Sequence, residues 1–533
     1  MKRFARLLDR LAFTPQRTAK LRLLAEYFRT TPDPDRGLAL AVLTDGLPVS
    51  LPVRRTFAEL MERRLDPELY RLSRDYVGDT AETVALLWPD TEMSSERSEL
   101  RLADVVAELE VIDRNRLATV LEAWLDRLDA TERWALLKLL TGALRVGVSA
   151  RLAKTALAEM SGESIDAIEE IWHGQRPPYA ALFAWLGGRG ARPDVTGIPV
   201  FRPMMLAHPL EDDDWAALDL AEFAAEWKWD GIRVQIAAAG SEVRLFSRTG
   251  DDIGQSFPEL VEAFRFDAVL DGELLVVRDG RVAPFNDLQQ RLNRRTVTRR
   301  MLTEHPAHVR LYDALQIEGE DLRPLPYSER RLRLAEWHRR RMPARTDLSP
   351  LLDVTAKEDL ATLQAGARDS GIEGVMLKRR QSPYLAGRPK GHWYKWKRSP
   401  LTADCVLMYA QRGSGKRSSF FSDFTFGAWT GPDADGPRRL VPVGKAYSGF
   451  TDAELGRLDR FVRENTVDRF GPVRALNPTL VVEVAFDAVQ RSSRHKSGIA
   501  MRFPRFARIR WDKPAAEADD LEQLASHIGD EQF

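Results

Sequence analysis

The chain has 533 residues and equal numbers of basic and acidic side chains, 79 Lys and Arg against 79 Asp and Glu. Its length predicts about three domains, and its zero net charge excludes binding of polyanions through global charge, so nucleic-acid contact needs local basic surfaces. A single cysteine, Cys405, excludes a disulfide framework and a Cys-rich zinc site and fits a reducing cytoplasm. No apolar run is long enough to predict a membrane-spanning helix.

Residues 1–197 have helical periodicity throughout and predict an all-helical domain. The first segment places four apolar residues on one helix face: Phe4, Leu7, Leu8 and Leu11. Glycines and prolines gather between Gly187 and Pro203, which is typical of a linker. A domain boundary near residue 198 follows.

The turn Leu144–Ser149 joins two of the predicted helices. Gly147 suits a chain reversal, and Ser149 can cap the next helix. Backbone amides at such a helix start can bind a phosphate, and three basic residues lie near it: Arg145, Arg151 and Lys154. On the pattern alone, an ordinary helix corner with solvated basic side chains is the better explanation.

Residues 198–399 predict an α+β domain with a mostly antiparallel sheet. Helical patterns at residues 328–341 and 357–369 separate some of the expected strands, which are Val234–Ile236, Val243–Phe246, Val269–Val277, Val309–Leu315 and Val375–Lys378.

Residues 400–533 have a third composition. Strand-like segments at residues 405–409, 424–429, 440–445 and 480–486 surround one helix, which opens with the capping box Thr451–Glu454. About five strands and one helix predict a β-barrel of the OB-fold type. The residues from Ala515 onward predict a short helix or a frayed tail.

The segment 227–233 carries the pattern Lys-x-Asp-Gly-x-Arg. Partial desolvation between two tryptophans favours the neutral amine of Lys228, which makes this lysine a candidate nucleophile toward an α-phosphate. Gly231 would let the backbone approach, and the planar fork of Arg233 would neutralise phosphate charge. The alternative is a strand end and turn with a solvated lysine.

Two carboxylates add to this pattern. Glu273 ends the triplet that begins at Asp271, and Glu373 begins an acid, glycine, strand and lysine series that ends at Lys378. Together Glu273 and Glu373 could hold a hard divalent cation with several retained waters, as magnesium prefers. Each acid taken singly is more often a surface charge.

Basic residues follow on the next strand and at a turn. The two-residue period of a strand places Lys395 and Lys397 on one face, which predicts a triphosphate pocket, or an edge strand protected by lysine. Arg248, after Ser247, lies at a turn where a phosphate of a nucleotide or of a nucleic acid could meet it.

The segment Gly413–Lys416 looks like a phosphate-binding loop, but the match fails. Ala410 stands where the first glycine of that motif is needed, and Arg417 replaces the hydroxyl residue. The segment therefore predicts a flexible basic loop.

Taken together, these motifs have the order and spacing of the nucleotidyltransferase series, and the chain resembles ATP-dependent DNA ligases. The resemblance is to the type with an N-terminal helical DNA-binding domain, found in archaea, eukaryotes and some bacteria, and it covers nearly the full chain. Its motifs are Lys228-x-Asp230-Gly231-x-Arg233, Ser247-Arg248, Asp271-Gly272-Glu273, Tyr312-Asp313, Glu373 to Lys378, Lys395-x-Lys397, and Arg502 to Arg505 through Arg510 to Lys513.

The resemblance implies a role for each matching residue. Lys228 would become adenylylated, Glu226 would help to read adenine, and Tyr312, where the family often has phenylalanine, would stack on the base. Arg233, Arg248 and Glu273 would contact the ribose or phosphates, and Glu373 would join Glu273 at the metal. The remaining implied roles are phosphate binding by Lys378, Lys395 and Lys397, orientation of pyrophosphate by Arg510 and Lys513, and DNA binding by the turn with Arg145, Gly147 and Ser149.

The resemblance also implies the activity. AMP would pass from ATP to the lysine and then to the 5′-phosphate of a nick in duplex DNA, and the 3′-hydroxyl would displace it. The implied domains are a helical DNA-binding domain (1–197), an adenylation domain (198–399) and an OB-fold domain with a short tail (400–533). The expected cofactors are ATP and Mg²⁺ or Mn²⁺, and the expected protein is a cytoplasmic monomer of a bacterium or archaeon that binds no membrane.

Alternative functions stay open at this point. An RNA ligase or an RNA-capping guanylyltransferase shares the lysine motif but lacks this long helical domain in front. An NAD-dependent ligase needs a cysteine-rich zinc module that one cysteine cannot form. A DNA-binding scaffold without catalysis should show decayed motifs, whereas Lys228, Glu273 and Glu373 are all present.

Overall fold

The apolar face predicted for the first helix is buried. In α1 (Lys2–Ala12), Phe4, Leu7, Leu8 and Leu11 are each at most 5% exposed. The structure is a computed structural model that describes residues 1–47, 53–77, 79–89, 100–142, 144–294, 296–366, 372–412, 420–431, 438–493 and 495–528. These residues form two compact units, the first built mainly from residues 1–396 and the second mainly from residues 397–533.

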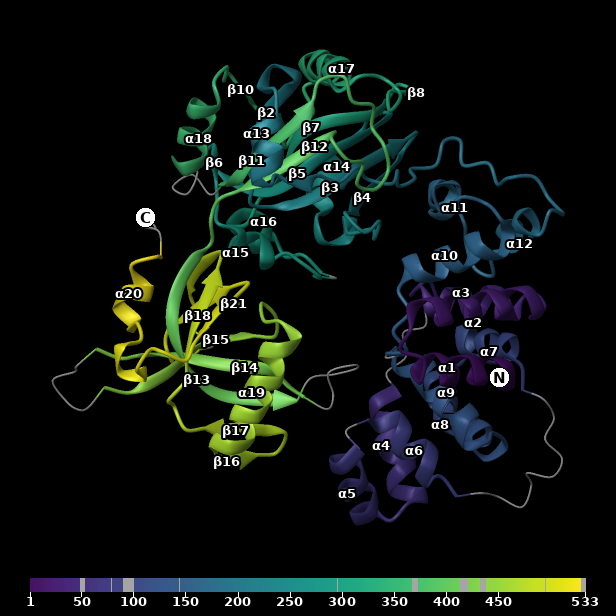
Figure 1. Cartoon of the computed structure of the whole chain (residues 1–533). Helices are drawn as coiled ribbons and strands as arrows, with labels where there is room; N and C mark the ends of the chain where they lie inside the picture. Colours follow the sequence, from purple (N-terminus) through teal and green to yellow (C-terminus); the bar gives the residue numbers. More distant parts are fainter. Residues whose placement is uncertain are drawn as a thin grey trace. The chain divides into compact units, whose positions relative to one another are not determined.

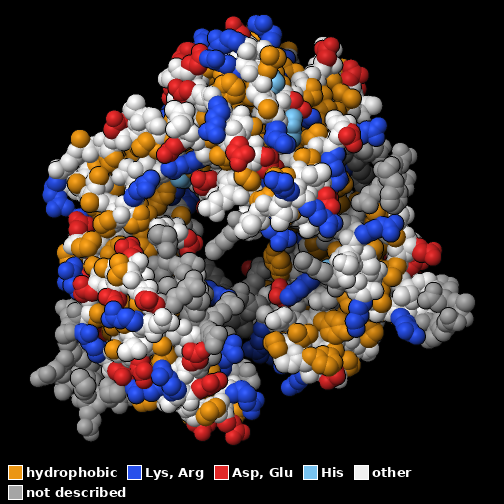
Figure 2. Space-filling model, turned by 180° about the vertical axis from the view of Figure 1, so that it is seen from behind, with side chains coloured by type: hydrophobic (Ala, Val, Ile, Leu, Met, Phe, Trp, Pro, Cys, Tyr) orange, Lys and Arg blue, Asp and Glu red, His pale blue; other side chains and the backbone are white. Residues whose placement is uncertain are grey.

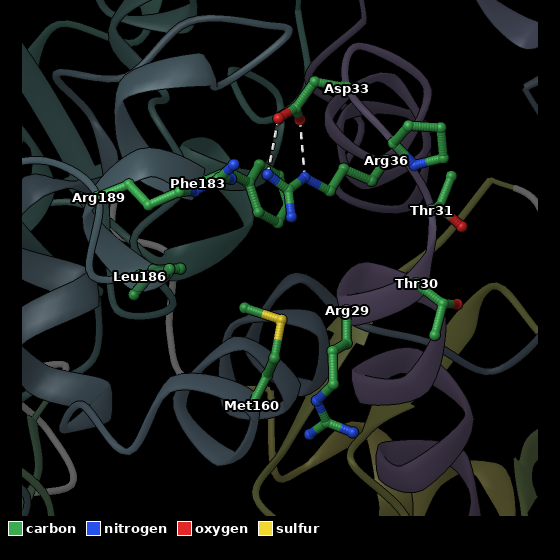
Figure 3. A pocket seen from close by; sticks show the side chains of 11 residues that line it. Arg29, Thr30, Thr31, Asp33, Arg36, Met160, Phe183, Leu186 and Arg189 are labelled. Atoms are coloured by element: carbon green, nitrogen blue, oxygen red, sulfur yellow. Dashed lines mark hydrogen bonds and ion pairs between the residues drawn. The ribbon is translucent and has the colours of Figure 1, made fainter.

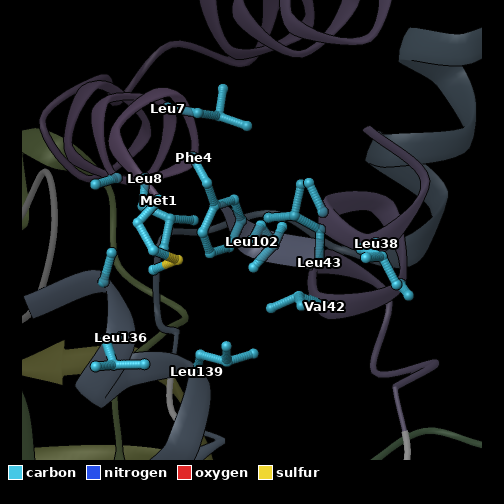
Figure 4. Packing of buried hydrophobic residues seen from close by; sticks show 14 of the residues in the cluster. Met1, Phe4, Leu7, Leu8, Leu38, Val42, Leu43, Leu102, Leu136 and Leu139 are labelled. Atoms are coloured by element: carbon cyan, nitrogen blue, oxygen red, sulfur yellow. The ribbon is translucent and has the colours of Figure 1, made fainter. Parts of the chain in front are cut away.

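The all-helical prediction for the start of the chain is confirmed (Figure 1). After α1 come α2 (Arg17–Thr30), α3 (Asp35–Leu43), α4 (Val53–Arg64), α5 (Pro67–Val77), α6 (Thr80–Leu87), α7 (Leu102–Val111), α8 (Arg114–Arg127), α9 (Ala130–Thr141), α10 (Ala150–Ser161), α11 (Ile165–Trp172) and α12 (Ala180–Leu186). Figure 4 shows Met1 and Phe4 beside Leu102, with Leu136 of α9 close by. Truncating a buried phenylalanine such as Phe4 costs about 3–5 kcal/mol, so this core stabilises the helical part.

Two sheets follow in the same unit. The first has the strand order β1 (His208–Pro209), β12 (Trp393–Lys397), β11 (Ile372–Arg379), β2 (Phe223–Trp229), β10 (Leu351–Leu352). The second has the order β4 (Glu242–Ser247), β3 (Ile232–Ala239), β5 (Ala268–Arg278), β7 (Ala307–Ile317), β8 (Glu320–Asp321), with β6 (Arg281–Val282) on β5 and β9 (Thr346–Leu348) on β7. The accompanying helices are α13 (Asp212–Ala217), α14 (Pro258–Ala263), α15 (Phe285–Gln289), α16 (Arg299–Glu304), α17 (Tyr327–Arg341) and α18 (Lys357–Gly366).

The prediction of an α+β part with mostly antiparallel strands is confirmed. Only the pairs β1 with β12 and β7 with β9 are parallel among the described strands of these sheets. The chain crosses from the first sheet to the second directly, because β2 and β3 are separated by two residues. This crossing carries the pattern that contains Lys228.

The second unit is rich in strands, as predicted. Its largest sheet joins β13 (Leu401–Arg412), β14 (Phe421–Trp429), β15 (Leu440–Ala446), β16 (Thr466–Phe470), β17 (Val473–Leu476), β18 (Val481–Phe486) and β21 (Arg505–Arg510), and a separate hairpin joins β19 (Ala488–Arg491) to β20 (Ile499–Arg502). The long strand β13 pairs with β14 along one edge and with β17 and β18 along the other. The remaining helices are α19 (Asp452–Asn465) and α20 (Leu521–Ala525).

The capping box predicted at Thr451 is confirmed. Glu454 N donates to Thr451 Oγ1 at 3.2 Å, and Thr451 N donates to a Glu454 carboxylate oxygen at 2.7 Å, at the start of α19. The sequence did not predict β16, β17 and β21, because these strands are short and charged residues interrupt their apolar pattern. The loop Gly413–Lys416 lies outside the described residues.

Within the described ranges, no helix is long and apolar enough to cross a membrane.

Candidate active site

Lys228 lies near the end of β2, where a run of apolar residues keeps the strand in the sheet. Ala224 and Ala225 before it are buried, whereas the Lys228 side chain is 23% exposed. Its Nζ forms an ion pair with Glu373 of the neighbouring strand β11. The expected lysine and carboxylate therefore meet, and the alternative of a fully solvated Lys228 is excluded.

A β-bulge turns Glu373 toward Lys228. In the pairing of β11 with β2, Gly374 lies opposite Lys228 and Met376 opposite Glu226, but Ile372 lies opposite Trp229, so residue 373 is the extra one. Regular alternation would send its side chain to the other face of the sheet, and a bulge re-aims a side chain in this way. Gly374 has φ 149°, a conformation that favours glycine.

Gly231 is required by the packing of the protein itself. A Cβ at this position would lie 2.5 Å from the carbonyl oxygen of Leu274 and 2.8 Å from Cγ of Glu273. The glycine thus allows the crossing between β2 and β3 to pack closely on β5, which carries Glu273. The close approach is to the protein's own backbone.

Arg233 of β3 is held by a buried carboxylate. Its Nε donates to Asp271 Oδ1 at 3.1 Å and its Nη2 to Asp271 Oδ2 at 2.5 Å, and Asp271 is 0% exposed. Nη1 donates to the Met205 carbonyl at 2.6 Å and Nη2 to the Tyr384 hydroxyl at 3.1 Å. A guanidinium has five N–H groups, so Arg233 positions the strands around Lys228 and keeps little donor capacity for a ligand.

Glu273, next to Arg233 across the β3–β5 ladder, has a strongly perturbed carboxyl group. Burial raises its pKa to about 8, and the negative charge of Glu373 adds to this, whereas Lys228 and Arg233 act in the opposite direction. The two predicted metal-binding carboxylates, Glu273 and Glu373, therefore lie close enough to influence each other.

Glu226 and Lys378 form a buried ion pair two residues along β2 from Lys228. Lys378 Nζ lies 2.9 Å from Glu226 Oε1, and both side chains are 2% exposed. The Tyr327 hydroxyl donates to the same oxygen, and burial together with the charge of Glu226 raises the pKa of Tyr327 well above its ordinary value. Lys378, which the resemblance assigns to phosphate, thus lies beside the residue assigned to adenine.

Tyr312 of β7 lies beside the ion pair of Glu226 and Lys378. Lys378 Nζ lies 4.2 Å from the centroid of its ring, and the Arg233 guanidinium carbon lies 5.9 Å from it. Burial raises the pKa of Tyr312 well above its ordinary value, so its hydroxyl stays protonated. An aromatic face is thus present where the resemblance expects one.

Lys395 and Lys397 lie on β12, beside β11 (Figure 1). The strand period puts them on the face of Trp393, whose ring centroid is 4.7 Å from Lys378 Nζ. Lys395 is partly exposed and Lys397 is exposed. Since β1 pairs with β12, the interpretation as a protected edge strand is wrong.

Arg248 is exposed at the turn after β4. That turn is fixed from the helical part, because His173 Nε2 donates to the Gly250 carbonyl at 2.7 Å and Arg244 Nη1 donates to the His173 carbonyl at 2.8 Å. Burial lowers the pKa of His173 to about 4, so the imidazole is neutral at pH 7. No sequence motif marked His173.

The turn Leu144–Ser149 has the geometry that its glycine and serine predict. Gly147 has φ 66°, and Ser149 Oγ accepts from Leu152 N at 3.2 Å as the N-cap of α10. A buried lysine of α2, Lys20, lies behind the turn and donates to the Val146 and Gly147 carbonyls. Arg145 is exposed with φ 48°, so a basic side chain is accessible beside the start of α10.

One basic residue predicted near this turn is not available to a ligand. Lys154 is buried and forms an ion pair with the buried Glu169 of α11. The prediction that Lys154 adds to a phosphate site is therefore wrong, because the helical spacing could not show that it faces α11.

The helical part also contains a cavity of about 530 Å³ (Figure 3). At its wall the Arg36 guanidinium lies 4.3 Å from the Phe183 ring centroid and donates to both carboxylate oxygens of Asp33 at 2.7 and 2.6 Å. No predicted site residue lines it. On the face shown in Figure 2, basic and acidic side chains are interspersed, in keeping with the zero net charge.

Arg510 and Lys513 of the second unit share one partner, Asp404 of β13. Lys513 Nζ lies 2.7 Å and Arg510 Nη1 3.3 Å from Asp404 Oδ2. Arg510 also forms an ion pair with Asp512 at 3.2 Å, and the hydrogen bond to Asp512 is the main reason why the pKa of Arg510 is raised. Within this unit Asp404 thus holds both basic residues, and no sequence motif marked Asp404.

Arg330 and Tyr384 were not predicted, because their partners Asp313 and Asp271 lie far from them in the chain. Arg330 and Asp313, both 0% exposed, form a bidentate pair at 2.8 and 2.9 Å, and the Tyr384 hydroxyl donates to Asp271 at 2.7 Å. Arg330 lies on the apolar face of a predicted helix, and a buried charge needs a partner. This position in the sequence could have indicated that Arg330 forms a buried ion pair.

Three family models match the chain. The model described as DNA ligase N terminus matches residues 1–158, the ATP dependent DNA ligase domain matches residues 204–397, and the ATP dependent DNA ligase C terminal region matches residues 417–513. The middle match contains the residues at Lys228, and the last contains Arg510 and Lys513.

Whole-chain relatives agree with the family models. A "Probable DNA ligase" of Koribacter versatilis (strain Ellin345) is 32% identical over 583 residues, which cover 100% of this chain and 97% of that protein. A "Probable DNA ligase" of Streptomyces griseus subsp. griseus is 34% identical over 540 residues, which cover 97% of each chain. The solved structure of Pmar-Lig_Pre is similar in fold, with a TM-score of 0.58 at 19% identity over 96% of this chain and 99% of that one.

Proposed function

The chain belongs to the ATP-dependent DNA ligase family, and on that premise we propose that it seals nicks in duplex DNA through an AMP group carried on Lys228. The observation that carries the proposal is the meeting of Lys228 with Glu373, Glu273 and the Arg233 brace at the crossing between two sheets.

In the first step the Nζ–Pα bond forms and the bond from Pα to the bridging oxygen breaks, so pyrophosphate leaves. The Lys228 ammonium must lose a proton before it attacks, and Glu373 is the carboxylate in contact with it. Charge neutralisation, more than acid–base chemistry, lowers the barrier of a phosphoryl transfer. Arg248 and Lys397, which are exposed, and Lys395, which is partly exposed, would perform that task.

A divalent cation, Mg²⁺ or Mn²⁺, fits the carboxylates at this site. Glu273 is buried with its pKa raised to about 8 and lies near a second carboxylate, Glu373, so a cation would favour the ionised form of Glu273. Among the described residues no group of three or more metal-ligating side chains exists, which suits magnesium because it keeps several waters. A metal held there by Glu273 and Glu373 would neutralise phosphate charge.

In the second and third steps AMP moves from Lys228 to the 5′-phosphate of the nick, and the 3′-hydroxyl then displaces AMP. The helical domain would hold the duplex partly through the turn with Arg145, Gly147 and Ser149, whose exposed basic side chain and helix-start amides suit backbone phosphates. The second unit, as an OB-fold domain, would bring Arg510 and Lys513 to the pyrophosphate in the first step. We propose a monomer that acts in the cytoplasm.

A sealing assay tests the proposed function. A 5′-labelled nicked DNA duplex is incubated with the protein, magnesium and either ATP, GTP or NAD, and a parallel reaction contains a nicked RNA duplex. ATP should support sealing of DNA, with little product from GTP, NAD or RNA. Sealing of RNA but not DNA would favour the RNA ligase alternative, and transfer of GMP without sealing would favour a capping enzyme.

A further inference from the structure

Trp229, which follows Lys228 at the end of β2, is held by two different contacts. The guanidinium carbon of Arg310, on β7, lies 4.1 Å from the centroid of the Trp229 ring, which is the geometry of a cation–π interaction. The indole Nε1 donates to Ser349 Oγ at 3.2 Å. Successive side chains of a strand point to opposite faces, so these contacts hold the strand beside Lys228 without involving the lysine side chain.

The guanidinium that lies on the indole is itself fixed. Arg310 Nε and Nη2 donate to the two carboxylate oxygens of Asp347, on β9, at 2.9 and 2.6 Å, and His308 Nε2 lies 3.3 Å from the same carboxylate. Burial acts to raise the pKa of Asp347, but the interactions with Arg310 and His308 lower this pKa to about 2. Asp347 is therefore ionised at neutral pH, and a bidentate bond of this kind fixes the orientation of the arginine.

Ser349 belongs to a segment that joins the two sheets of the first unit. Because β9 pairs with β7 of the second sheet and β10 pairs with β2 of the first, residues 346–352 cross between the sheets. At this crossing Ser349 is 0% exposed, its N donates to the Leu311 carbonyl at 2.8 Å, and its carbonyl accepts from Arg331 Nη2 at 2.7 Å. The chain also crosses directly after Trp229, between β2 and β3. The bond from Trp229 to Ser349 therefore ties the two crossings together beside the nucleophile.

The strand ladder is least regular at the end of β2. The two residues of β10 pair with Ala225 and Glu226, and within the described ranges neither pairs with Lys228 or Trp229. On the other side of β2, strand β11 has its bulge at Glu373. The side-chain contacts of Trp229 add a restraint where the backbone pairing is weakest.

We propose that Arg310 and Asp347 are positioning residues for Lys228 and that they act through Trp229. The inference rests on the proposed function, because it concerns the attack of Lys228 on the α-phosphate. Reacting atoms must be held about 3–3.5 Å apart and aligned, and a displacement of about 1 Å can lower the rate about 100-fold. The anchored Trp229 fixes the main chain at Lys228 and leaves the lysine side chain free to carry AMP to the DNA.

Single-turnover formation of enzyme–AMP over a range of ATP concentrations tests this role. Trp229→Ala and Arg310→Ala should lower the rate at saturating ATP about 10- to 100-fold, while the half-saturating ATP concentration stays within about twofold of the parent's. Trp229→Phe keeps a ring on Arg310 and loses only the bond to Ser349, so it should be slowed only about 5-fold. Arg310→Lys keeps the charge without the planar fork, and its rate should lie between those of the parent and Arg310→Ala.

Sealing of a pre-adenylylated nick separates positioning from a general structural role, because Lys228 forms no bond in that step. All four variants should seal such a nick at close to the parent's rate. The matched control is Arg333→Ala, which removes an exposed arginine of α17 that donates to a Glu320 carboxylate oxygen at 3.1 Å. This control should form enzyme–AMP at the parent's rate, and urea unfolding verifies that each variant folds.

The outcomes distinguish this role from the proposed function. If Trp229→Ala and Arg310→Ala form enzyme–AMP as fast as the parent, the positioning role is wrong even though the lysyl-AMP chemistry stands. The role is also wrong if sealing of the pre-adenylylated nick falls as much as enzyme–AMP formation, or if only the half-saturating ATP concentration changes. Should an alanine variant fail to fold, Trp229→Phe and Arg310→Lys decide the question, because the parent's rate in both would overturn the role. If the parent forms no enzyme–AMP with ATP, the proposed function itself fails and the positioning role fails with it.

Discussion

The brace between Arg233 and Asp271 predicts a measurable loss in the first step. Asp271 accepts three hydrogen bonds, two from Arg233 and one from Tyr384 at 2.7 Å. In Asp271→Asn the amide keeps one acceptor oxygen, and its NH₂ group opposes the guanidinium. Loss of one charge-assisted bond costs about 1.5–3 kcal/mol, which corresponds to a rate of enzyme–AMP formation about 10- to 150-fold lower.

Tyr384→Phe is the matched control, because it removes one hydroxyl from the same carboxylate and leaves both Arg233 bonds. It should slow the reaction by only about 5-fold, for about 1 kcal/mol. The assay is single-turnover formation of enzyme–AMP at saturating ATP, with urea unfolding to verify that both variants fold. A larger loss in Tyr384→Phe than in Asp271→Asn, or rates within twofold of the parent in both, would refute the brace.

Three further predictions concern other parts of the site. The Asp404 carboxylate holds Lys513 at 2.7 Å, so Asp404→Asn should release this lysine and speed enzyme–AMP formation severalfold. Lys513→Ala should slow enzyme–AMP formation more than it slows sealing of a pre-adenylylated nick. Equal effects of Lys513→Ala on both steps would contradict the role of Lys513. In the metal-free protein the Glu273 carboxyl has a pKa of about 8 in the folded state, whereas in the unfolded chain it has the ordinary pKa of 4.5. The unfolded chain therefore releases this proton first, and the free energy of unfolding should fall as pH rises from about 5 to 8. Glu273→Gln should reduce this fall in urea midpoints measured with EDTA, and an unchanged slope would argue against the raised pKa. Gly374→Ala should strain the bulge by about 1–3 kcal/mol and move Glu373 away, which should lower the rate of enzyme–AMP formation about 5- to 150-fold. A rate equal to the parent's would show that the bulge is not required.

The sequence predicted the helical, α+β and β-rich parts because each has its own hydrophobic period. Strand alternation was enough to place Lys395 and Lys397 on one face. The same alternation could not predict that Glu373 reaches Lys228, because that contact depends on a bulge in the pairing of β11 with β2.

Long-range partners explain what else the sequence could not predict. In the sequence, Lys154 is one of several basic residues near a turn. Only the packing of α10 on α11 shows that the Glu169 carboxylate neutralises its charge. Likewise, the motif order marks Lys378, but its neighbour Glu226 is known only from the β2–β11 register. Such contacts join residues far apart in the chain, where local pattern carries no information.

The most direct test of the central claim is transfer of label from ATP to the protein. The parent, Lys228→Ala and the surface control Lys2→Ala are incubated with magnesium and ATP labelled at the α-phosphate, without DNA. The parent and Lys2→Ala should acquire covalent, acid-labile label that nicked DNA then removes, and Lys228→Ala should acquire none. Labelling of Lys228→Ala at the parent's level would contradict the assignment of Lys228 as the AMP carrier.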